Sequence, residues 1–298
     1  PPIKSRRLRG SFAICEEGFK MRFGAPLFTP WADPEGWIDA LARKGYRAAY
    51  TPVEEDPGPE AVAAYADAAR RADVVIAEVG AWSNPMSPDP AVRREAIALC
   101  QRRLALAEAL GARCCVNITG AVGERWDGPY PGNYGPDVFD QVVETTREII
   151  DAVRPTRTVY ALEPMPWMLP SSTEEYQRLL KAIDRKAFGV HMDLANLICS
   201  PQRYFDFAAF AREFIRTLGG HIVSCHLKDV LLMPDLTCHL QEHAPGLGGL
   251  DLGALLGMIH SQLPADIPVM LEHLPDEAAY DAAAAHVRGL ADAAGIPL

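Results

Sequence analysis

The sequence predicts an α/β fold, a (β/α)8 TIM barrel, on two observations. Short apolar runs rich in Val, Ile and aromatic residues recur along the chain, and each is followed by a turn and a longer segment with helical periodicity. Eight such pairs can be counted. Because parallel strands buried on both faces need helices outside them, the pairs fit a closed barrel or an open doubly wound sheet, and their number favours the barrel.

The eight expected strands share a high content of β-branched and aromatic residues. In chain order they are Met21–Ala25, Ala48–Val53, Val74–Val79, Cys114–Ile118, Val159–Glu163, Gly189–Asp193, Val223–Leu227 and Val269–Glu272. The segment Phe12–Cys15 competes with the first of them.

The expected outer helices are amphipathic segments between these strands. They are Pro59–Arg71, Ala91–Leu110, Val138–Val153, Thr173–Ile183, Phe205–Leu218, Leu252–Gln262 and Glu277–Ala294. Helix starts are indicated by caps and acidic first-turn residues, as after Ser172, and the same signals predict a further start at Asp33.

The chain is expected to form one domain. No Ser- or Gly-rich linker divides it, and its longest irregular stretch, residues 121–136, is rich in Pro and Gly and fits an active-site loop. Residues 1–10 contain a basic cluster and are expected to form a flexible N-terminal arm, with residues 11–298 as a single barrel domain. The glycine cluster at 246–249 follows an expected loop, so it predicts a turn and not a dinucleotide-binding strand–turn–helix.

The charge balance opposes two classes of partner. The chain has 29 basic and 39 acidic residues and a formal charge of -10, which disfavours nonspecific binding to nucleic acid or anionic lipid. No run approaches the ~20 apolar residues of a membrane span and no secretion signal is evident, so we expect a cytoplasmic protein. The seven cysteines show no Cys-x-x-Cys spacing and predict mostly buried free thiols.

Four of the last expected strands end in side chains that can bind a metal. They contribute Glu163, Asp193, His226 and Glu272, and in a barrel these strand ends converge on one mouth. Three carboxylates and one imidazole suit one divalent ion, with Mn²⁺ first and Mg²⁺, Co²⁺ or Zn²⁺ as alternatives. A closed structural zinc site would instead favour cysteine.

Six segments together resemble the xylose isomerase-like TIM barrel superfamily of sugar phosphate isomerases and epimerases, which includes ketose 3-epimerases. They are IAEVGAWSNP at 76–85, VNITG at 116–120, ALEPMPW at 161–167, GVHMDLANLICSP at 189–201, CHLKDV at 225–230 and VMLEHL at 269–274. The resemblance implies one catalytic metal on the same four residues. It also implies that Glu163 and Glu272 act as an acid/base pair on opposite faces of the substrate.

The chain departs from the ketose 3-epimerase pattern at two positions. Asn196 stands where those enzymes have a substrate-binding histidine, and Leu232 stands where they have an arginine. The departures leave the expected metal set intact and leave the specific 3-epimerase reaction in doubt.

Other side chains near the strand ends are candidates for substrate contacts, with ordinary packing or ion pairing as the alternative for each. Lys228 could stabilise a developing oxyanion or form a salt bridge, and His191 fits an orienting role below the metal. The candidates are Lys228, Asn196, Glu78, Asn117, Trp82, Trp167 and His191, with His239, Glu242 and His243 in the loop after the seventh strand.

These features predict a metal-dependent sugar isomerase or epimerase that moves a proton next to a carbonyl of a ketose, keto-inositol or related polyol through an enediolate. The first alternative is a lyase or dehydratase that uses the same metal and base on a 3-keto sugar, keto-inositol or oxidised C-glycoside. An abasic-site endonuclease and a noncatalytic sugar-binding barrel are further alternatives. We expect a small-molecule sugar or polyol as substrate, with no nucleic acid or membrane partner, and the sequence is compatible with a homo-oligomer.

Overall fold

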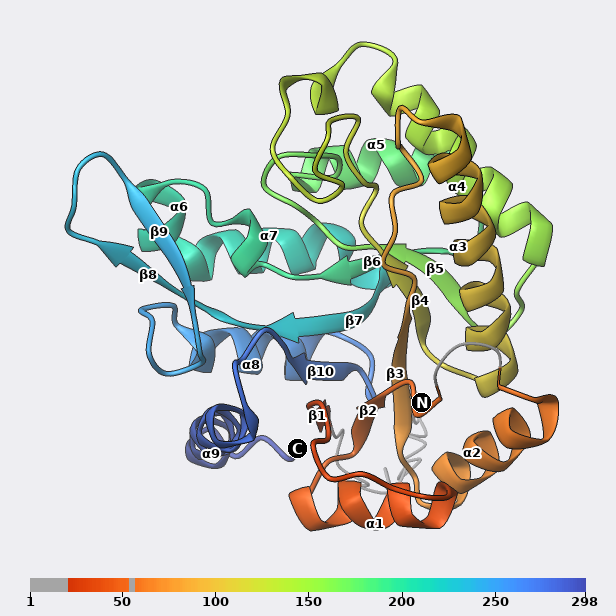
Figure 1. Ribbon diagram of the computed structural model, residues 1–298. Coiled ribbons are helices and arrows are strands. Elements are labelled where there is room, and N and C mark those ends of the chain that lie inside the picture. Colours follow the sequence, from red (N-terminus) through yellow and green to blue (C-terminus); the bar gives the residue numbers. More distant parts are fainter. Residues whose placement is uncertain (1–20, 54–56) are drawn as a thin grey trace, which may run out of the picture.

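Eight parallel strands close into a barrel in the computed structural model, which describes residues 21–53 and 57–298 (Figure 1). Around the barrel the strands follow the order β1-β10-β7-β6-β5-β4-β3-β2. The predicted (β/α)8 TIM barrel is therefore confirmed. The expected N-terminal arm at residues 1–10 and the competing strand at Phe12–Cys15 lie outside the described residues.

The barrel strands agree with the expected ones to within a few residues. They are β1 Arg22–Gly24, β2 Ala48–Tyr50, β3 Val75–Gly80, β4 Cys114–Asn117, β5 Val159–Leu162, β6 Phe188–Met192, β7 Ile222–Leu227 and β10 Pro268–Leu271. In the register of β10 with β7, Met270 pairs with His226, so the residue after β10 lies just above that histidine.

Helices surround the barrel, as Figure 1 shows. They are α1 Pro34–Lys44, α2 Pro59–Arg71, α3 Pro90–Leu110, α4 Val138–Val153, α5 Thr173–Ile183, α7 Phe207–Leu218, α8 Leu252–Gln262 and α9 Glu277–Ala293. The expected caps are present: Asp33 accepts a hydrogen bond from the Gly36 backbone N–H at 2.8 Å, and Ser172 accepts one from that of Glu175 at 3.2 Å. No helix in the described part of the chain is long and apolar enough to cross a membrane.

The main departure from the expected elements follows β7. A hairpin of β8 Asp229–Met233 and β9 His239–His243 projects beyond the barrel, where the sequence predicts only a loop. Strand β9 is mostly polar and lacks the apolar alternation that predicts a strand. A short helix, α6 Pro201–Phe205, precedes α7, and Ser200 caps it by accepting from the Arg203 backbone N–H at 3.2 Å.

Asp229, the first residue of the hairpin, holds the loop that leads back to the barrel. Its buried carboxylate accepts from the backbone N–H groups of Gly246, Gly248 and Leu250 at 3.0 to 3.1 Å. A Cβ on Gly248 would lie 2.2 Å from Asp229 Oδ1, so the loop needs glycine at this position. The glycine cluster therefore forms a turn, as expected.

The barrel core is apolar except for a polar layer near the carboxyl ends of the strands. Fully or almost fully buried polar side chains in this layer include Glu78, His191, Asp193, His226 and Lys228. The free cysteines Cys100, Cys114, Cys115 and Cys225 are buried, whereas Cys199 and Cys238 are exposed. The expectation of mostly buried thiols therefore holds for the described cysteines, with these two loop positions as exceptions.

Candidate metal centre and cavity

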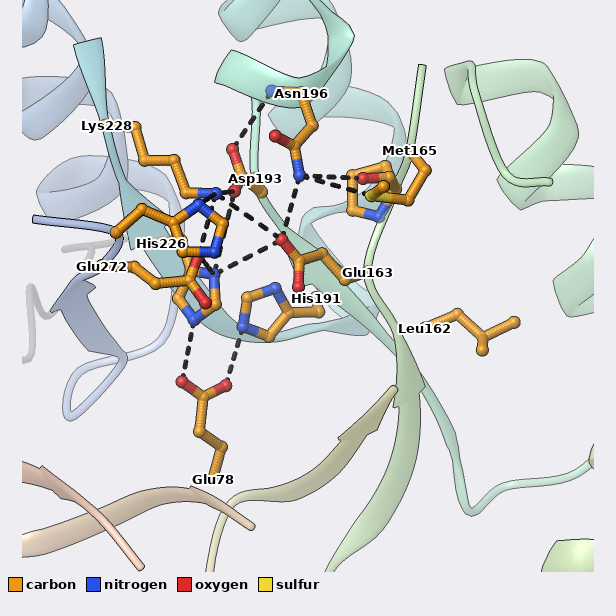
Figure 2. A network of polar contacts seen from close by, with 12 residues as sticks. Glu78, Leu162, Glu163, Met165, His191, Asp193, Asn196, His226, Lys228 and Glu272 are labelled. Carbon is orange, nitrogen blue, oxygen red and sulfur yellow. Dashed lines mark hydrogen bonds and ion pairs between the residues drawn. The ribbon is translucent and has the colours of Figure 1, made fainter. Parts of the chain in front are cut away.

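Four side chains meet at the carboxyl ends of the barrel strands. Glu163, Asp193 and Glu272 directly follow β5, β6 and β10, and His226 is the next-to-last residue of β7. One potential ligand atom from each residue lies within 4.8 Å of the others. Figure 2 shows the side chains pointing toward one another from separate strands. The structure thus brings together the four residues that the sequence singles out as metal ligands.

The surroundings of His226 indicate whether these four side chains could hold a cation. Its Nδ1 atom is buried and makes no hydrogen bond to any described residue. It faces Glu272 Oε2 at 3.0 Å, Glu163 Oε1 at 3.5 Å and Asp193 Oδ2 at 3.8 Å. A nitrogen lone pair and three carboxylate oxygens repel one another unless a proton or a metal ion lies between them. The donor set therefore fits a divalent ion bound through His226 Nδ1 and the three carboxylates.

Lys228 supplies one positive charge at the edge of this group. Its buried Nζ atom lies 2.8 Å from both Asp193 Oδ2 and Glu272 Oε2, and 3.9 Å from Glu163 Oε1. The sequence left open a substrate contact or a salt bridge for Lys228, and the structure shows the salt bridges. One ammonium group does not balance three carboxylates, two of which are buried, so the site still favours a further cation.

The surroundings change the pKa values of the four residues in different directions. Burial raises the pKa of Glu163. Burial would also raise the pKa values of Asp193 and Glu272, but Lys228 and His226 hold both below the usual range. Burial opposes the charge on His226, yet Glu272 and Glu78 raise its pKa well above the ordinary value. Of the three carboxylates, Glu163 therefore has the highest affinity for a proton.

A second layer of side chains lies beneath the ligand group. Glu78 on β3 places Oε1 2.9 Å from His226 Nε2 and Oε2 2.8 Å from His191 Nε2. Burial disfavours the charge of Glu78, but His226 and His191 lower its pKa to about 2. The ionised Glu78 accepts a hydrogen bond from His226 Nε2–H, which leaves the Nδ1 lone pair directed at the candidate ion. Glu78 and His191 thus lie directly beneath the candidate metal group, and Glu78 contacts its histidine.

Asn196 holds Glu163 in place. Its Nδ2 group donates to Glu163 Oε1 at 3.0 Å and to the Pro164 carbonyl at 3.1 Å, and its backbone N–H donates to Asp193 Oδ1 at 3.3 Å. Where ketose 3-epimerases have a histidine, this chain therefore has an amide that contacts two members of the candidate metal group. Asn196 also borders the cavity above them.

An open cavity of about 420 Å³ lies above the ligand group. Of the four candidate ligands, Glu163 and Glu272 line it, whereas Asp193 and His226 lie beneath. Both expected tryptophans, Trp82 and Trp167, contribute to its wall. The lining residues are Trp82, Ile118, Trp126, Asp127, Glu163, Met165, Pro166, Trp167, Asn196, Glu242, Glu272 and His273.

The loops that carry this wall are tied to each other. Trp167 Nε1 donates to the Asp127 carbonyl at 2.7 Å, and Asn133 Nδ2 donates to the Trp167 carbonyl at 3.0 Å. Tyr134 donates its hydroxyl hydrogen to the Pro166 carbonyl at 3.3 Å. The long irregular segment at 121–136 therefore packs beside the loop after β5 as part of the cavity wall, consistent with its expected place in the active site.

Some expected contact residues lie away from the cavity. Asn117 is buried and uses its amide on Ser83 and on the Ile118 backbone N–H, so it joins β4 to the loop after β3. Glu78 and His191 are enclosed below the metal group. His239 and His243 lie on β9 but do not line the cavity.

Several cavity residues were not among the sequence candidates. Trp126 and Asp127 lie in a loop without periodicity, and only the Pro- and Gly-rich composition pointed to that loop. His273 directly follows Glu272, and its place beside a candidate metal ligand could have marked it as a site residue. Its Nδ1 atom lies 3.1 Å from both Lys228 Nζ and Glu242 Oε1, so it connects the metal group to the hairpin.

Comparisons with known proteins agree with this fold. The family model described as xylose isomerase-like TIM barrel matches residues 38–290. No curated protein sequence gives a significant match. Among solved structures, the D-psicose 3-epimerase from Clostridium cellulolyticum H10 has 16% identity and a TM-score of 0.65, covering 92% of this chain and 98% of that one.

Two further structures are similar to the same extent. A 3-keto-D-glucoside 4-epimerase from E. coli has 13% identity and a TM-score of 0.65, covering 92% of this chain and 100% of that one. A xylose isomerase-like TIM barrel protein from Mycobacterium smegmatis, solved in complex with magnesium, has 13% identity and a TM-score of 0.62, covering 92% of this chain and 96% of that one.

Proposed function

Because this chain belongs to the xylose isomerase-like TIM barrel family, we propose that it is a divalent-metal-dependent sugar isomerase or epimerase. The proposed reaction moves a proton next to a carbonyl of a ketose, keto-inositol or related polyol. The names of two similar structures, a D-psicose 3-epimerase and a 3-keto-D-glucoside 4-epimerase, support the sugar class.

One observation carries this proposal. Of the four residues that could hold the ion, only the two glutamates, Glu163 and Glu272, also border the open cavity. They come from strands β5 and β10, which β6 and β7 separate in the closed order. Two carboxylates that can face both an ion and a substrate from different strands suit an acid/base pair on opposite sides of a sugar carbon.

The proposed metal would be held by Glu163, Asp193, His226 and Glu272, with Mn²⁺ or Mg²⁺ as first candidates because carboxylates dominate the set. When bound, a divalent ion supplies Lewis-acid polarisation to a carbonyl and a neighbouring hydroxyl. Asp193 and His226 lie below the cavity and serve as ligands only. Lys228 adds positive charge near the place where negative charge develops on the substrate.

The two glutamates would share the proton transfer. One carboxylate removes the proton from the carbon next to the carbonyl, and the other returns a proton on the opposite face or to the neighbouring carbon. Glu163 fits the base because burial raises its pKa and Asn196 fixes its orientation through a 3.0 Å hydrogen bond. The surrounding cations lower the pKa of Glu272, which makes it the weaker base of the two.

Proton exchange in D₂O tests the proposal without knowledge of the product. The Mn²⁺-loaded protein is incubated with a panel of ketoses, inososes and keto-glycosides, and deuterium incorporation is followed by NMR. We expect exchange at a carbon next to the carbonyl of at least one member, with an isomer or epimer as product. Release of water or an aglycone would instead establish the lyase alternative. No exchange with any carbonyl sugar, by protein of full metal content, would refute the proposed chemistry.

A further inference from the structure

The cavity wall carries more aromatic surface than one sugar ring uses. Trp82, Trp126 and Trp167 all line the cavity, and Ile118, Met165 and Pro166 add aliphatic surface. The volume of about 420 Å³ lies within the range of pockets that enclose organic ligands larger than a single small metabolite. One indole can stack on the C–H face of a pyranose ring, and the others then need a further apolar group.

Two of these indoles are half-exposed at the mouth. Trp82 is 43% exposed and Trp126 is 37% exposed, although large aromatic side chains usually lie buried. Exposed indoles that border a cavity are typical of binding surfaces that a ligand covers. They come from separate loops, after β3 and after β4, and both border the same cavity.

The aromatic wall is held in position by the contacts of the chain itself. Trp167 is anchored through Nε1 to the Asp127 carbonyl at 2.7 Å, and Trp126 directly precedes Asp127. Trp82 folds back over Gly80, because a Cβ at that glycine would lie 2.4 Å from Trp82 Nε1. A preorganised wall loses little conformational entropy when it binds a rigid ring.

The charges that line the cavity oppose an anionic ligand. The lining carboxylates are Asp127, Glu163, Glu242 and Glu272, and His273 is the one basic side chain among the described lining residues. His273 is paired with Glu242 at 3.1 Å, and Asp127 is paired with Arg125 at 2.6 Å. Lys228, just below, already contacts Asp193 and Glu272 at 2.8 Å.

A bound divalent ion would not change this conclusion. The ion and Lys228 together would balance Glu163, Asp193 and Glu272, and no cation of the cavity would remain for a phosphate. Phosphate recognition normally uses Arg or Lys side chains or a helix N-terminus with free N–H groups. Sugar phosphates and uronic acids would therefore find no unpaired cation among the described lining residues to balance their charge.

We infer that the substrate is an uncharged keto-glycoside in ring form, whose ketone-bearing sugar ring lies over the glutamates and whose apolar, ring-shaped substituent lies against Trp126 and Trp82. This inference rests on the proposed function and names the substrate class of the same site. Phosphorylated and acidic sugars are excluded from that class.

Binding of inert probes tests the inference separately from turnover. Isothermal titration of the Mn²⁺-loaded protein would use methyl β-D-glucopyranoside, phenyl β-D-glucopyranoside and the 6-phosphate of the phenyl glucoside. These sugars carry no ketone, so they report binding alone. We expect the phenyl glucoside to bind at least about tenfold more tightly than the methyl glucoside, since about 1.4 kcal/mol of aromatic contact suffices for that ratio.

The phosphate arm tests the charge argument. At low salt the 6-phosphate should bind at least about tenfold more weakly than the parent phenyl glucoside, and salt should reduce the difference by screening. Glu242→Gln should reduce it as well, because it removes one carboxylate from the wall. Equal or tighter binding of the phosphate would overturn the inference.

Two tryptophan variants locate the substituent. Trp126→Ala should remove most of the preference for phenyl over methyl, and Trp126→Phe, which keeps a ring, should restore part of it. Phe205→Ala changes an aromatic side chain that is 73% exposed and does not line the cavity, so it should leave the preference intact. Metal content and circular dichroism of each variant confirm that the fold is retained.

The outcomes separate this inference from the proposed function. Proton exchange on sugar phosphates or free ketoses, with no preference for the phenyl glucoside, would overturn the substrate class and keep the function. Tight binding of the phenyl glucoside by a protein that exchanges no carbonyl sugar would keep the cavity assignment and overturn the function. No binding of either glucoside, or equal binding of both, would also overturn the inference.

Discussion

Glu78 and His226 face each other across the inside of the barrel, with Glu78 Oε1 2.9 Å from His226 Nε2. Their strands, β3 and β7, stand opposite each other in the closed order of eight. The contact crosses the barrel, with Glu78 and His226 both buried. It determines which ring nitrogen of His226 is free for an ion, because a ring nitrogen that donates its proton cannot also bind metal.

The first prediction follows from this contact. Glu78→Gln keeps the size of the side chain but removes the negative charge that accepts hydrogen bonds from two imidazoles. We expect the affinity for Mn²⁺ to fall by about 10- to 100-fold, the usual effect of losing an outer partner of a ligand. Isothermal titration with Mn²⁺ measures it, and Glu144→Gln, an exposed change on α4, serves as control. Unchanged affinity would show that Glu78 does not orient the ligand.

The second prediction concerns His226 itself. His226→Ala removes the one nitrogen of the ligand group, and we expect the protein to lose its divalent ion. His221→Ala alters an exposed histidine just before the opposite end of the same strand and should retain full metal content. Elemental analysis after gel filtration measures both variants. Full metal content in His226→Ala would remove His226 from the site.

The third prediction is the pH dependence of metal binding. Although burial opposes the charge, the carboxylates around His226 raise its pKa well above the ordinary value, so a proton should compete with the metal ion for this imidazole. The ion must displace that proton. Affinity for Mn²⁺ should therefore rise with pH, by about tenfold per pH unit below the raised pKa if one proton is released.

Titration in two buffers with different heats of ionisation counts the released protons. In Glu78→Gln the pKa of His226 should be lower, because one of the charges that raise it is gone. The pH dependence should then move to lower pH in this variant. An affinity that does not change with pH, with no proton release, would contradict the assignment of His226 as a ligand.

The candidate ligands at the strand ends could be predicted from the sequence because each position is recognisable from its neighbours in the chain. Glu163, Asp193 and Glu272 follow apolar runs directly, and once the fold is a parallel barrel its topology brings these positions together. The pairing of Glu78 with His226 could not be predicted in this way. The two residues are 148 positions apart, and only the closed strand order places them opposite each other.

The residues of the cavity wall could be predicted from the sequence less well than the candidate ligands beneath the cavity. Trp126 lies in a loop whose conformation depends on contacts such as the one between Asn133 and the Trp167 carbonyl, and no periodicity in the loop encodes them. The β8–β9 hairpin carries Glu242 to the cavity, but its second strand is too polar to be recognised by alternation. Loops of this kind obtain their shape from tertiary contacts.

The fourth prediction uses the close approach of Trp82 to Gly80. An added Cβ at Gly80 would lie 2.4 Å from Trp82 Nε1, so Gly80→Ala should push the indole outward. We expect greater quenching of tryptophan fluorescence by acrylamide with unchanged Mn²⁺ content. Gly58→Ala adds a Cβ with nothing within 4 Å and should have no such effect. Identical quenching in both variants would show that Trp82 does not need the space above Gly80.

The last prediction separates the two glutamates that line the cavity. Glutamine at position 163 or 272 keeps the size of the side chain and one coordinating oxygen while it removes the basic carboxylate, so ligation and proton transfer can be distinguished. Metal content is measured first for Glu163→Gln and Glu272→Gln, and turnover is compared only at full occupancy. Both variants should lose overall turnover by roughly 10²-fold or more, the scale of general acid–base catalysis.

Deuterium exchange then assigns the roles of the pair. Burial raises the pKa of Glu163, and neighbouring cations lower that of Glu272. Glu163 should therefore be the better base, and we call the epimer from which it removes the proton the first epimer. We therefore expect Glu163→Gln to lose exchange from that epimer, and Glu272→Gln to retain the exchange but fail to form product. The reverse epimer should show the opposite pattern, because the residue that donates in one direction abstracts in the other. Near-normal turnover in both metal-loaded variants would move the base to a residue other than these two glutamates.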